Sequence, residues 1–277
     1  MGRRFQTAAF LLTSIAALTA CSSEDPAAIT PDAAEQDDAT TFPDAEAPPP
    51  HPLAQDARCP LGMAYVSGFC IDRYEAYVVA VDDAGVESPH SPFDVLGDGG
   101  FRAKVARGVV PQGYISQLQA AAACANAGKR LCTQAEFVLA CRGPDVANAY
   151  PYGGTVRKPG DCNEGKGSSM PLFFGNDATK WTYANFNDPR LNQWDGGLAK
   201  TGDFKACVSP YGAYDCVGNL HEWGADPPDS KGHGRFRGGF YGDAEINGHG
   251  CLYVTSAHEV AYHDYSTGFR CCADPKK

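Results

Sequence analysis

Motifs of several common enzyme classes are missing from this 277-residue sequence. It contains no P-loop, no G-x-S-x-G motif, no H-E-x-x-H motif and no internal repeat. The sequence therefore gives no indication of a P-loop NTPase, an α/β-hydrolase or a zinc protease. No C-x2-C pair recurs either, which argues against a zinc site built from cysteine pairs.

Basic residues are missing from residues 22–57, which are rich in Ala, Pro and Asp and contain nine acidic residues. Such a composition cannot bury enough apolar surface to offset chain entropy, so we expect a disordered acidic tether over residues 21–57. Without these nine acids and the N-terminal Arg3 and Arg4, 21 basic and 24 acidic residues remain, a net charge of -3. A nearly neutral remainder without basic clusters gives no reason to expect a nucleic-acid partner.

The N-terminal apolar run, residues 8–20, is shorter than the ~20 residues of a membrane-spanning helix and is typical of a secretory signal peptide. The sequence Leu-Thr-Ala-Cys that ends at Cys21 resembles the bacterial lipobox, in which the cysteine is acylated. We therefore predict a lipoprotein signal peptide over residues 1–20 and a lipid anchor at Cys21; the alternative is an ordinary signal peptide. Ser22 favours the outer membrane, so the predicted location is the cell envelope.

The remaining residues 58–277 are long enough for one domain with a sizeable core. They contain eleven cysteines, and export to an oxidising compartment makes disulfides the expected state. Cys59 and Cys70 bracket an apparent hairpin of short strands, and we expect them to pair. The odd number of cysteines leaves at least one thiol unpaired or in an intermolecular bond.

Two helices are predicted. The first lies within residues 114–131, where Ser116 and Gln119 form a capping box and Gly128 ends the alanine-rich body. The second lies within residues 132–143. It has Thr133 as N-cap, Glu136 three residues later and Gly143 after the end, with Leu131, Phe137, Ala140 and Cys141 facing a core. The rest of the chain shows few long periodic runs, so these helices are expected to be the main ones.

Six ordered segments resemble the formylglycine-generating enzyme (sulfatase-modifying factor) family. They are FCIDRYEAY, AAAACANAGKRLCTQAEFVLACRG, YPYGG, YGAYDCVGNLHEW, RFRGGFY and TGFRCCAD. The resemblance extends from about Cys59 to Asp274 and implies an α+β fold related to C-type lectins. With the residue patterns above, the expected domain has two main helices, short strands, long loops and several disulfides.

The resemblance also implies cysteine pairs. In the family, the cysteine before AGKRL bonds to the GFRC cysteine, and the cysteine that ends the second helix bonds to one after the RGG segment. A further loop bond is expected, as is a bond between two cysteines that the family pattern lacks. The resulting pairs are Cys124–Cys271, Cys141–Cys251, Cys162–Cys207 and Cys132–Cys272. Cys216, where the family usually has Met, is the candidate free thiol.

Structural calcium is a second implication of the resemblance, because calcium prefers oxygen ligands. The first expected site uses the side chains of Asn185 and Asp195 with the carbonyls of Phe186 and Gly197. The second uses Asn219 and Glu222 with the carbonyl of Gly218 or Leu220. The alternative for Asn219 and Glu222 is that they only close a turn through hydrogen bonds.

The family's reaction uses two cysteines, five residues apart after the RGG motif, that bind copper and activate oxygen. Here Asp243 and Gly248 occupy those positions, and neither can replace a thiolate as a copper(I) ligand. We therefore do not expect copper-dependent cysteine oxidation.

Two functions remain open. One is a metal-dependent oxidase, with non-heme iron or copper, that acts on thiol or protein substrates; the iron ligands would come from Asp243, Glu245, His249, His258 and His263. The other, which we favour, is binding or scaffolding at the cell envelope, with a glycan, peptide or protein as partner. Its contact surface would use the aromatic side chains of Trp181, Tyr183, Trp194, Tyr241, Tyr253 and Tyr262. The alternative is that these side chains are packed in the core.

Overall fold

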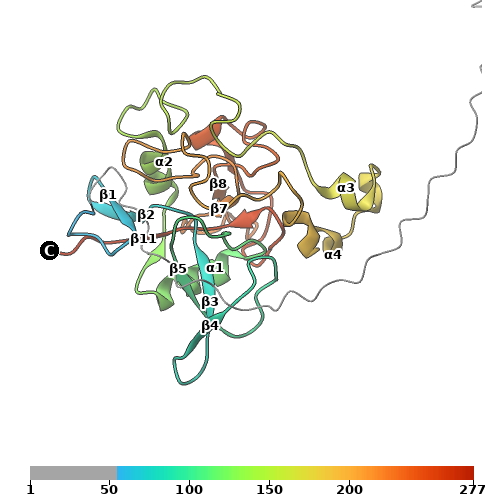
Figure 1. The fold of residues 1–277 in the computed structure, drawn as a ribbon, viewed down its shortest axis with the longest axis horizontal. Helices are drawn as coiled ribbons and strands as arrows, with labels where there is room; N and C mark the ends of the chain where they lie inside the picture. The colour runs from blue at the N-terminus through green and yellow to red at the C-terminus, as the bar shows by residue number, and fades with distance from the viewer. Residues whose placement is uncertain (1–54) are drawn as a thin grey trace, which may run out of the picture. The chain divides into compact units, whose positions relative to one another are not determined.

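A computed structural model describes residues 55–277 of the chain (Figure 1). The predicted signal peptide over residues 1–20, the predicted lipid anchor at Cys21 and residues 21–54 of the predicted tether lie outside the described residues. None of the helices in residues 55–277 has the length and hydrophobicity of a membrane-spanning helix.

Short strands in the described residues form three small sheets. Their orders are β1-β2-β11-β6, β10-β7-β8-β9 and β4-β3-β5, and neighbouring strands are antiparallel except for β7 and β10. The strands are β1 (Met63–Val66), β2 (Phe69–Asp72), β3 (Tyr77–Val81), β4 (Glu87–Pro89), β5 (Gly100–Lys104), β6 (Arg130–Leu131), β7 (His221–Trp223), β8 (Phe236–Arg237), β9 (Val254–Thr255), β10 (Thr267–Gly268) and β11 (Cys271–Ala273).

The predicted hairpin near the start of the domain is present as β1 and β2. A two-residue turn joins the strands, and both Ser67 and Gly68 have positive φ, as a tight hairpin requires. Met63 pairs with Asp72 at the open end. In the same sheet β11, from the end of the chain, lies between β2 and β6. Figure 1 shows β11 beside β2.

Both predicted helices are confirmed. Helix α1 (Gln117–Asn126) starts at Ser116, whose hydroxyl and Gln119 form the capping box. Helix α2 (Gln134–Arg142) starts at Thr133 and ends at Gly143, which has φ +80°. As predicted, Leu131, Phe137, Ala140 and Cys141 are buried. The capping residues in the sequence therefore set the limits of both helices.

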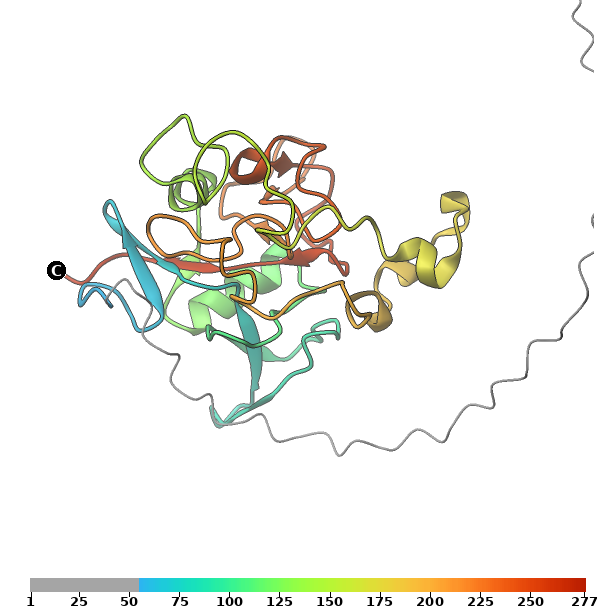
Figure 2. The same cartoon turned by 45° about the horizontal axis from the view of Figure 1, so that its top comes forward.

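The other helical segments are single turns. They are α3 (Met170–Phe174), η1 (Ala178–Lys180), α4 (Tyr183–Phe186), η2 (Pro189–Asn192) and η3 (Gly250–Leu252). Helices α3 and α4 lie beside each other away from the sheets (Figures 1 and 2). The predicted α+β fold with two main helices, short strands, long loops and several disulfides is confirmed.

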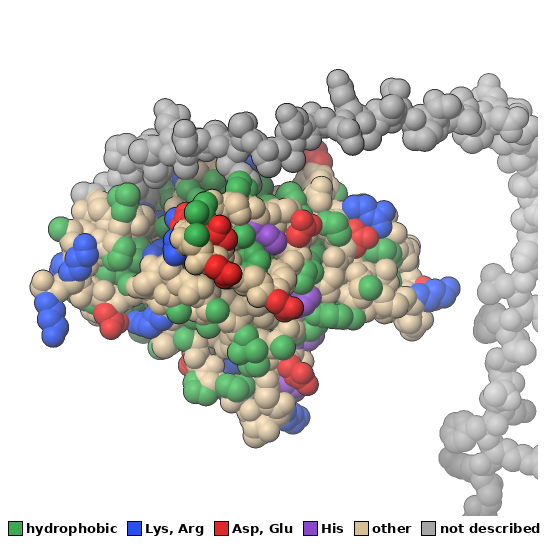
Figure 3. Space-filling model, turned by 90° about the horizontal axis from the view of Figure 1, so that it is seen from below, with side chains coloured by type: hydrophobic (Ala, Val, Ile, Leu, Met, Phe, Trp, Pro, Cys, Tyr) green, Lys and Arg blue, Asp and Glu red, His purple; other side chains and the backbone are tan. Residues whose placement is uncertain are grey.

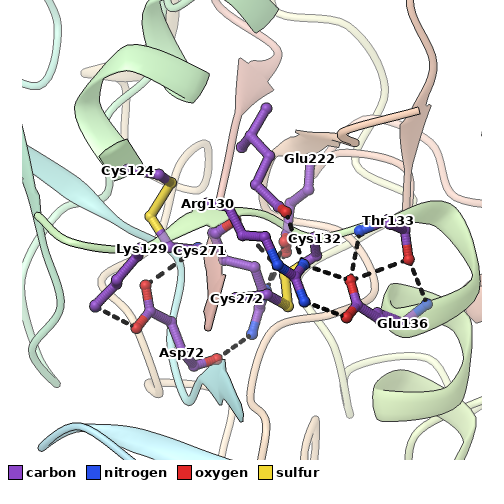
Figure 4. The surroundings of a disulfide bond; sticks show 12 residues. Asp72, Cys124, Lys129, Arg130, Cys132, Thr133, Glu136, Glu222, Cys271 and Cys272 are labelled. Carbon is purple, nitrogen blue, oxygen red and sulfur yellow. Dashed lines mark hydrogen bonds and ion pairs between the residues drawn. A yellow bond between two sulfur atoms is a disulfide. The ribbon is translucent and has the colours of Figure 1, made fainter. Parts of the chain in front are cut away.

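Five disulfides cross-link the described residues, and they join the same cysteines that the sequence analysis pairs. Four bonds span between 45 and 147 residues of sequence, and one closes the first hairpin over 11 residues. Cys124–Cys271 and Cys132–Cys272 anchor neighbouring positions of β11 to α1 and to the start of α2 (Figure 4). The bonds are Cys59–Cys70, Cys124–Cys271, Cys132–Cys272, Cys141–Cys251 and Cys162–Cys207.

Candidate functional site

The segment 237–251, where the resemblance places the family's chemistry, begins with a glycine turn after β8. Gly238 and Gly239 both have positive φ, and a Cβ on Gly238 would lie 2.6 Å from the Cys216 carbonyl oxygen. The chain then turns back, and Asp243 Oδ1 accepts hydrogen bonds from the backbone N–H groups of Glu245 (2.9 Å) and Ile246 (3.2 Å). The Asp243 carboxylate therefore closes a local turn.

Glu245 and His249 meet at the surface of this segment. Glu245 Oε2 lies 2.6 Å from His249 Nδ1, and Glu245 Oε1 accepts a hydrogen bond from the Tyr150 hydroxyl. Desolvation of the tyrosine and its bond to this carboxylate raise the pKa of Tyr150. The side chain of His249 is 69% exposed, so its other ring nitrogen faces solvent.

No free thiol lies in this segment. Gly248 occupies the second family cysteine position with φ +115°, and Cys251 is bonded to Cys141. Cys216 is the free cysteine of residues 55–277, and it is buried. Burial raises the pKa of the Cys216 thiol to about 12. Since thiolates are the form that binds copper(I), the described residues offer no thiolate pair.

Two of the histidines proposed as iron ligands, His258 and His263, do not contact Glu245. His258 stacks on Tyr262, with ring centroids 3.8 Å apart, and His263 Nδ1 lies 2.7 Å from Asn187 Oδ1. Burial lowers the pKa of both His258 and His263. Within residues 55–277 no three His, Cys, Asp or Glu side chains are placed to hold a metal ion. Of the proposed iron set, only Glu245 and His249 are in contact through their side chains.

The first predicted calcium set is engaged in internal hydrogen bonds. Asn185 Oδ1 accepts from the backbone and the hydroxyl of Thr182, as part of the N-terminal cap of α4. The carbonyl of Phe186 accepts from the Tyr265 N–H, and that of Gly197 from the side chain of Asn163. Asp195 is exposed. A calcium ion at these residues would have to share or replace those bonds.

The second predicted calcium set lies in the core. Glu222 on β7 holds the Arg270 guanidinium through two bonds of 2.5 and 2.6 Å, and both side chains are almost fully buried. Asn219, at positive φ after Gly218, accepts hydrogen bonds at Oδ1 from Asn163 (2.7 Å) and from the backbone of Ala199 (2.9 Å). Glu222 already has a cation beside it, so it has no need of calcium for charge balance.

A further buried carboxylate pair lies next to this set, and the sequence analysis missed it. Glu75 accepts from the Leu220 N–H (3.0 Å) and from the Asn219 side chain, and Asp215 accepts from the Gly202 N–H (2.7 Å). Burial raises the pKa of Asp215 to about 7. Burial and then the nearby Asp215 and Glu222 raise the pKa of Glu75 well above its ordinary value. The sequence offered a signal for both, because each acid has an aromatic residue directly before it, Tyr74 and Tyr214, and a small residue directly after it.

His221 is another residue that the sequence analysis missed. It is buried, and desolvation lowers its pKa to about 3, so the imidazole is neutral at pH 7. Its Nδ1 lies 3.2 Å from Ser266 Oγ, and its Nε2 lies 3.4 Å from the Tyr253 hydroxyl. The Asn247 side chain donates to that hydroxyl (3.0 Å), so the polar contacts of His221 reach segment 237–251.

The same polar contacts continue toward the opposite side of His221. Ser266 Oγ donates to Asp264 Oδ1, and the Tyr262 hydroxyl donates to Asp264 Oδ2, both at 2.7 Å. Asp264 and Ser266 are buried, whereas Tyr262 is partly exposed. A continuous series of hydrogen bonds therefore links Tyr262 to Asn247 in segment 237–251.

The aromatic residues proposed as one contact surface divide into two groups. Tyr241 and Tyr253 are buried and belong to the core. Trp181, Trp194 and Tyr262 are partly exposed, and Tyr183 is 50% exposed. Tyr183 and Tyr262, with His233, His258 and Glu259, line an open pocket of ≈ 430 Å³. The structure thus assembles only part of the predicted set around one concave surface.

The described residues form an α+β domain cross-linked by disulfides, with a buried Arg270–Glu222 ion pair and no free thiol in segment 237–251. The chain belongs to the family of the sulfatase-modifying factor enzyme 1-like domain, which matches residues 45–275. This confirms the family resemblance seen in the sequence. No curated protein matches the chain.

Solved structures with a similar arrangement have low sequence identity. The I1 variant of the Major Tropism Determinant shares 14% identity over 78% of this chain, with a TM-score of 0.43. The U1 variant shares 15% identity over the same share, with a TM-score of 0.42. The structure titled "Crystal Structure of CarF" shares 18% identity over 73% of this chain and 59% of that one, with a TM-score of 0.30. The chain spans about half the length of the Major Tropism Determinant variants, 53% of each.

Proposed function

We propose that this chain is an exported, lipid-anchored member of its family that binds a ligand at the cell envelope and does not carry out copper-dependent cysteine oxidation. The observation that carries the proposal is the state of the thiols. Ten cysteines of residues 55–277 are in disulfides, and the remaining thiol, on Cys216, is buried with a pKa near 12. A copper(I) centre needs accessible thiolates, which this arrangement does not supply.

Export is supported by the number of disulfides, because bonds of this kind form and persist in oxidising compartments. The lipobox-like sequence that ends at Cys21 supports a lipid anchor, and Ser22 supports the outer membrane as its place. Nucleic acid is not a proposed partner. The face drawn in Figure 3 shows acidic, basic and apolar side chains interspersed, with no broad basic patch.

Calcium is part of the proposal as a structural ion. Of the two predicted sets, the one with Asn185, Asp195 and the carbonyls of Phe186 and Gly197 fits better, because Asp195 is exposed and carbonyl oxygens have a second lone pair. Calorimetry with calcium, combined with a melting curve, tests this. Binding that Asp195→Asn weakens is the expected result; no heat and no shift in melting temperature would remove calcium from the proposal.

The oxidase alternative is tested by metal analysis and oxygen uptake on the same protein. The full chain is loaded with copper(I) or iron(II), desalted and assayed for bound metal and for oxygen consumption with a thiol peptide. We expect no stoichiometric copper and no oxygen uptake. Stoichiometric iron that is lost in both Glu245→Gln and His249→Ala would instead support a non-heme iron site at the one contact between side chains of the set.

The anchor is tested separately in cells. Radiolabelled palmitate should label the wild-type chain, and Cys21→Ser should remove the label and release the protein from the membrane fraction. A variant at another N-terminal residue, Ser14→Ala, serves as the control because it leaves the lipobox-like sequence intact. Palmitate label that persists in Cys21→Ser would contradict a lipid anchor at this residue.

A further inference from the structure

The pocket of ≈ 430 Å³ lies on the side of the domain where α4 meets residues 257–262. Its size falls within the usual range for sites that bind small molecules, about 300–1,000 Å³. Its walls combine the rings of Tyr183 and Tyr262 with the side chains of His233, His258 and Glu259. The pocket therefore offers both ring surfaces and hydrogen-bonding groups.

The aromatic rings of the pocket are held in place by bonds at their hydroxyl ends. The Tyr183 hydroxyl donates to the carbonyl of His263 (2.9 Å), and the Tyr262 hydroxyl donates to Asp264 (2.7 Å). The rings of Tyr183 and Tyr262 contact each other at 5.5 Å with a tilt of 47°. A ligand would thus meet ring surfaces that are already oriented, which lowers the entropy cost of binding.

Tyr183 is the most exposed ring of the pocket, at 50%. The His258 ring stacks on Tyr262, with centroids 3.8 Å apart, and lies nearly parallel to Phe236, with centroids 6.0 Å apart. Tyr262 uses one face for His258 and contacts Tyr183 on another side. Tyr183 is therefore the open wall. One exposed ring suits the flat face of a ligand. The sites that recognise quaternary ammonium ions typically combine several rings in a cage.

The polar groups of the pocket can both donate and accept hydrogen bonds. The lowered pKa of His258 leaves its imidazole neutral at pH 7, with one nitrogen as donor and the other as acceptor. His233 contacts Asp229 through Nδ1 at 3.4 Å, which leaves Nε2 for another partner. The exposed Glu259 carboxylate adds acceptors. This mixture matches hydroxyl groups, each of which donates and accepts.

We propose that this pocket binds a saccharide, with one pyranose ring packed on Tyr183 and its hydroxyl groups bonded to His258, His233 and Glu259. The C–H bonds on one face of a pyranose suit the negative face of an aromatic ring. The inference rests on the proposed binding function and gives it a ligand class and a location. A transition metal is a weaker fit, because no three His, Cys, Asp or Glu side chains of residues 55–277 are placed to hold one.

Saturation-transfer NMR and calorimetry on the full chain test the proposal. The probes are N-acetylglucosamine, methyl β-D-glucopyranoside and cellobiose, with choline and Zn²⁺ as competing chemistries. We expect binding of at least one saccharide, weakened about tenfold by Tyr183→Ala, which removes the wall. His258→Phe keeps the ring stack but has no ring nitrogens, and it should weaken binding by a similar factor.

The matched control is Tyr211→Ala. Tyr211 is a partly exposed tyrosine whose hydroxyl contacts Ser67, and it does not line the pocket, so saccharide binding should stay within twofold of wild type, about the error of such a titration. Binding of choline or Zn²⁺ alone, or saccharide binding that Tyr183→Ala and His258→Phe leave intact, would overturn the proposal. So would binding of no probe at all. The oxygen-uptake assay and the Cys21 labelling test the proposed function independently of the saccharide probes, so a failure here is distinguishable from a failure of the proposed function.

Discussion

Two regions of this domain contain the same kinds of residue, an ion pair next to a disulfide, but differ in how deeply the pair is buried. Around β11, Arg270 pairs with Glu222, and the following Cys271 and Cys272 are both in disulfides (Figure 4). In segment 237–251, His249 pairs with Glu245, and Cys251 is in a disulfide.

Burial separates the two regions. The side chains of Arg270 and Glu222 are 1% and 2% exposed, whereas those of His249 and Glu245 are 69% and 30% exposed. A buried charge is no longer solvated by water, so removing its partner strongly destabilises the fold. An exposed charge stays solvated, so its partner contributes little to stability. Substitutions around β11 should therefore lower the free energy of unfolding much more than substitutions in segment 237–251. Four predictions follow this contrast from the largest effect to the smallest.

The disulfides at β11 should show a strongly non-additive effect. Cys124–Cys271 and Cys132–Cys272 close almost the same loop, since their sequence separations are 147 and 140 residues. In the chain-entropy model, loss of either bond costs roughly 2–3 kcal/mol because the other bond still closes the long loop, but loss of both costs roughly 7 kcal/mol. Urea denaturation of the two double-alanine variants and the quadruple variant measures this. Additive costs would contradict it.

Arg270→Met should destabilise the fold by about 3–5 kcal/mol, because it leaves Glu222 buried without its cation. Its matched control is Lys180→Met, which removes a cation from an exposed pair with Asp177 and should change the free energy of unfolding by less than about 1 kcal/mol. Urea denaturation at pH 7 measures both. Equal effects of the two substitutions would show that burial does not distinguish the pairs.

Asp215 should make stability fall as pH rises from about 4 to 7. Its pKa is about 7 when folded, against an ordinary value of 3.8, so the folded state binds more protons than the unfolded state in this window. The contribution is fully present below pH 4 and is lost as pH rises through 7. Asp215→Asn should remove this loss, and also part of that from Glu75, whose pKa the Asp215 charge raises.

The measurement for Asp215 is the difference in free energy of unfolding between variant and wild type across pH 4 to 8. His221, with its pKa lowered to about 3, contributes the opposite slope in both proteins and therefore cancels in the difference. A difference of a few kcal/mol that grows with pH is expected. A difference that does not change with pH would show that Asp215 is not the group that takes up a proton on folding.

His249→Ala should have the smallest effect. The exposed pair with Glu245 is expected to contribute less than about 1 kcal/mol, and the carboxylate keeps its bond from Tyr150. Thermal melting at pH 6 and pH 8 checks this. A loss of several kcal/mol would mean that the segment is as tightly coupled to the core as β11 is.

Local structure was predictable because its signals are local. Ser116 with Gln119, and Thr133 with Glu136, begin helices through contacts within four residues, and Gly143 ends the second helix through its own φ. The first hairpin follows the same logic. The family, too, was recognisable from short ordered motifs, and it matches residues 45–275.

The candidate site was predicted less well, because composition does not show which side chains meet. Acids and histidines are frequent near the C-terminus, but Asp243 closes a turn, and His258 and His263 are held by Tyr262 and Asn187. Among the aromatic residues, burial of Tyr241 and Tyr253 could not be read from residue type, since tyrosine occurs in cores and on surfaces.

By itself, the sequence determined the helix limits, the first hairpin, the family and the lack of cysteines at Asp243 and Gly248, because each depends on neighbouring residues or on residue identity. Only the tertiary structure decided the environment of each charge. Glu222 and Arg270 lie 48 residues apart in sequence, and Asp72 and Cys271 lie 199 residues apart. Folding brings such groups together and removes their water, and that loss of solvent sets the strength of the ion pair and the raised pKa of Asp215.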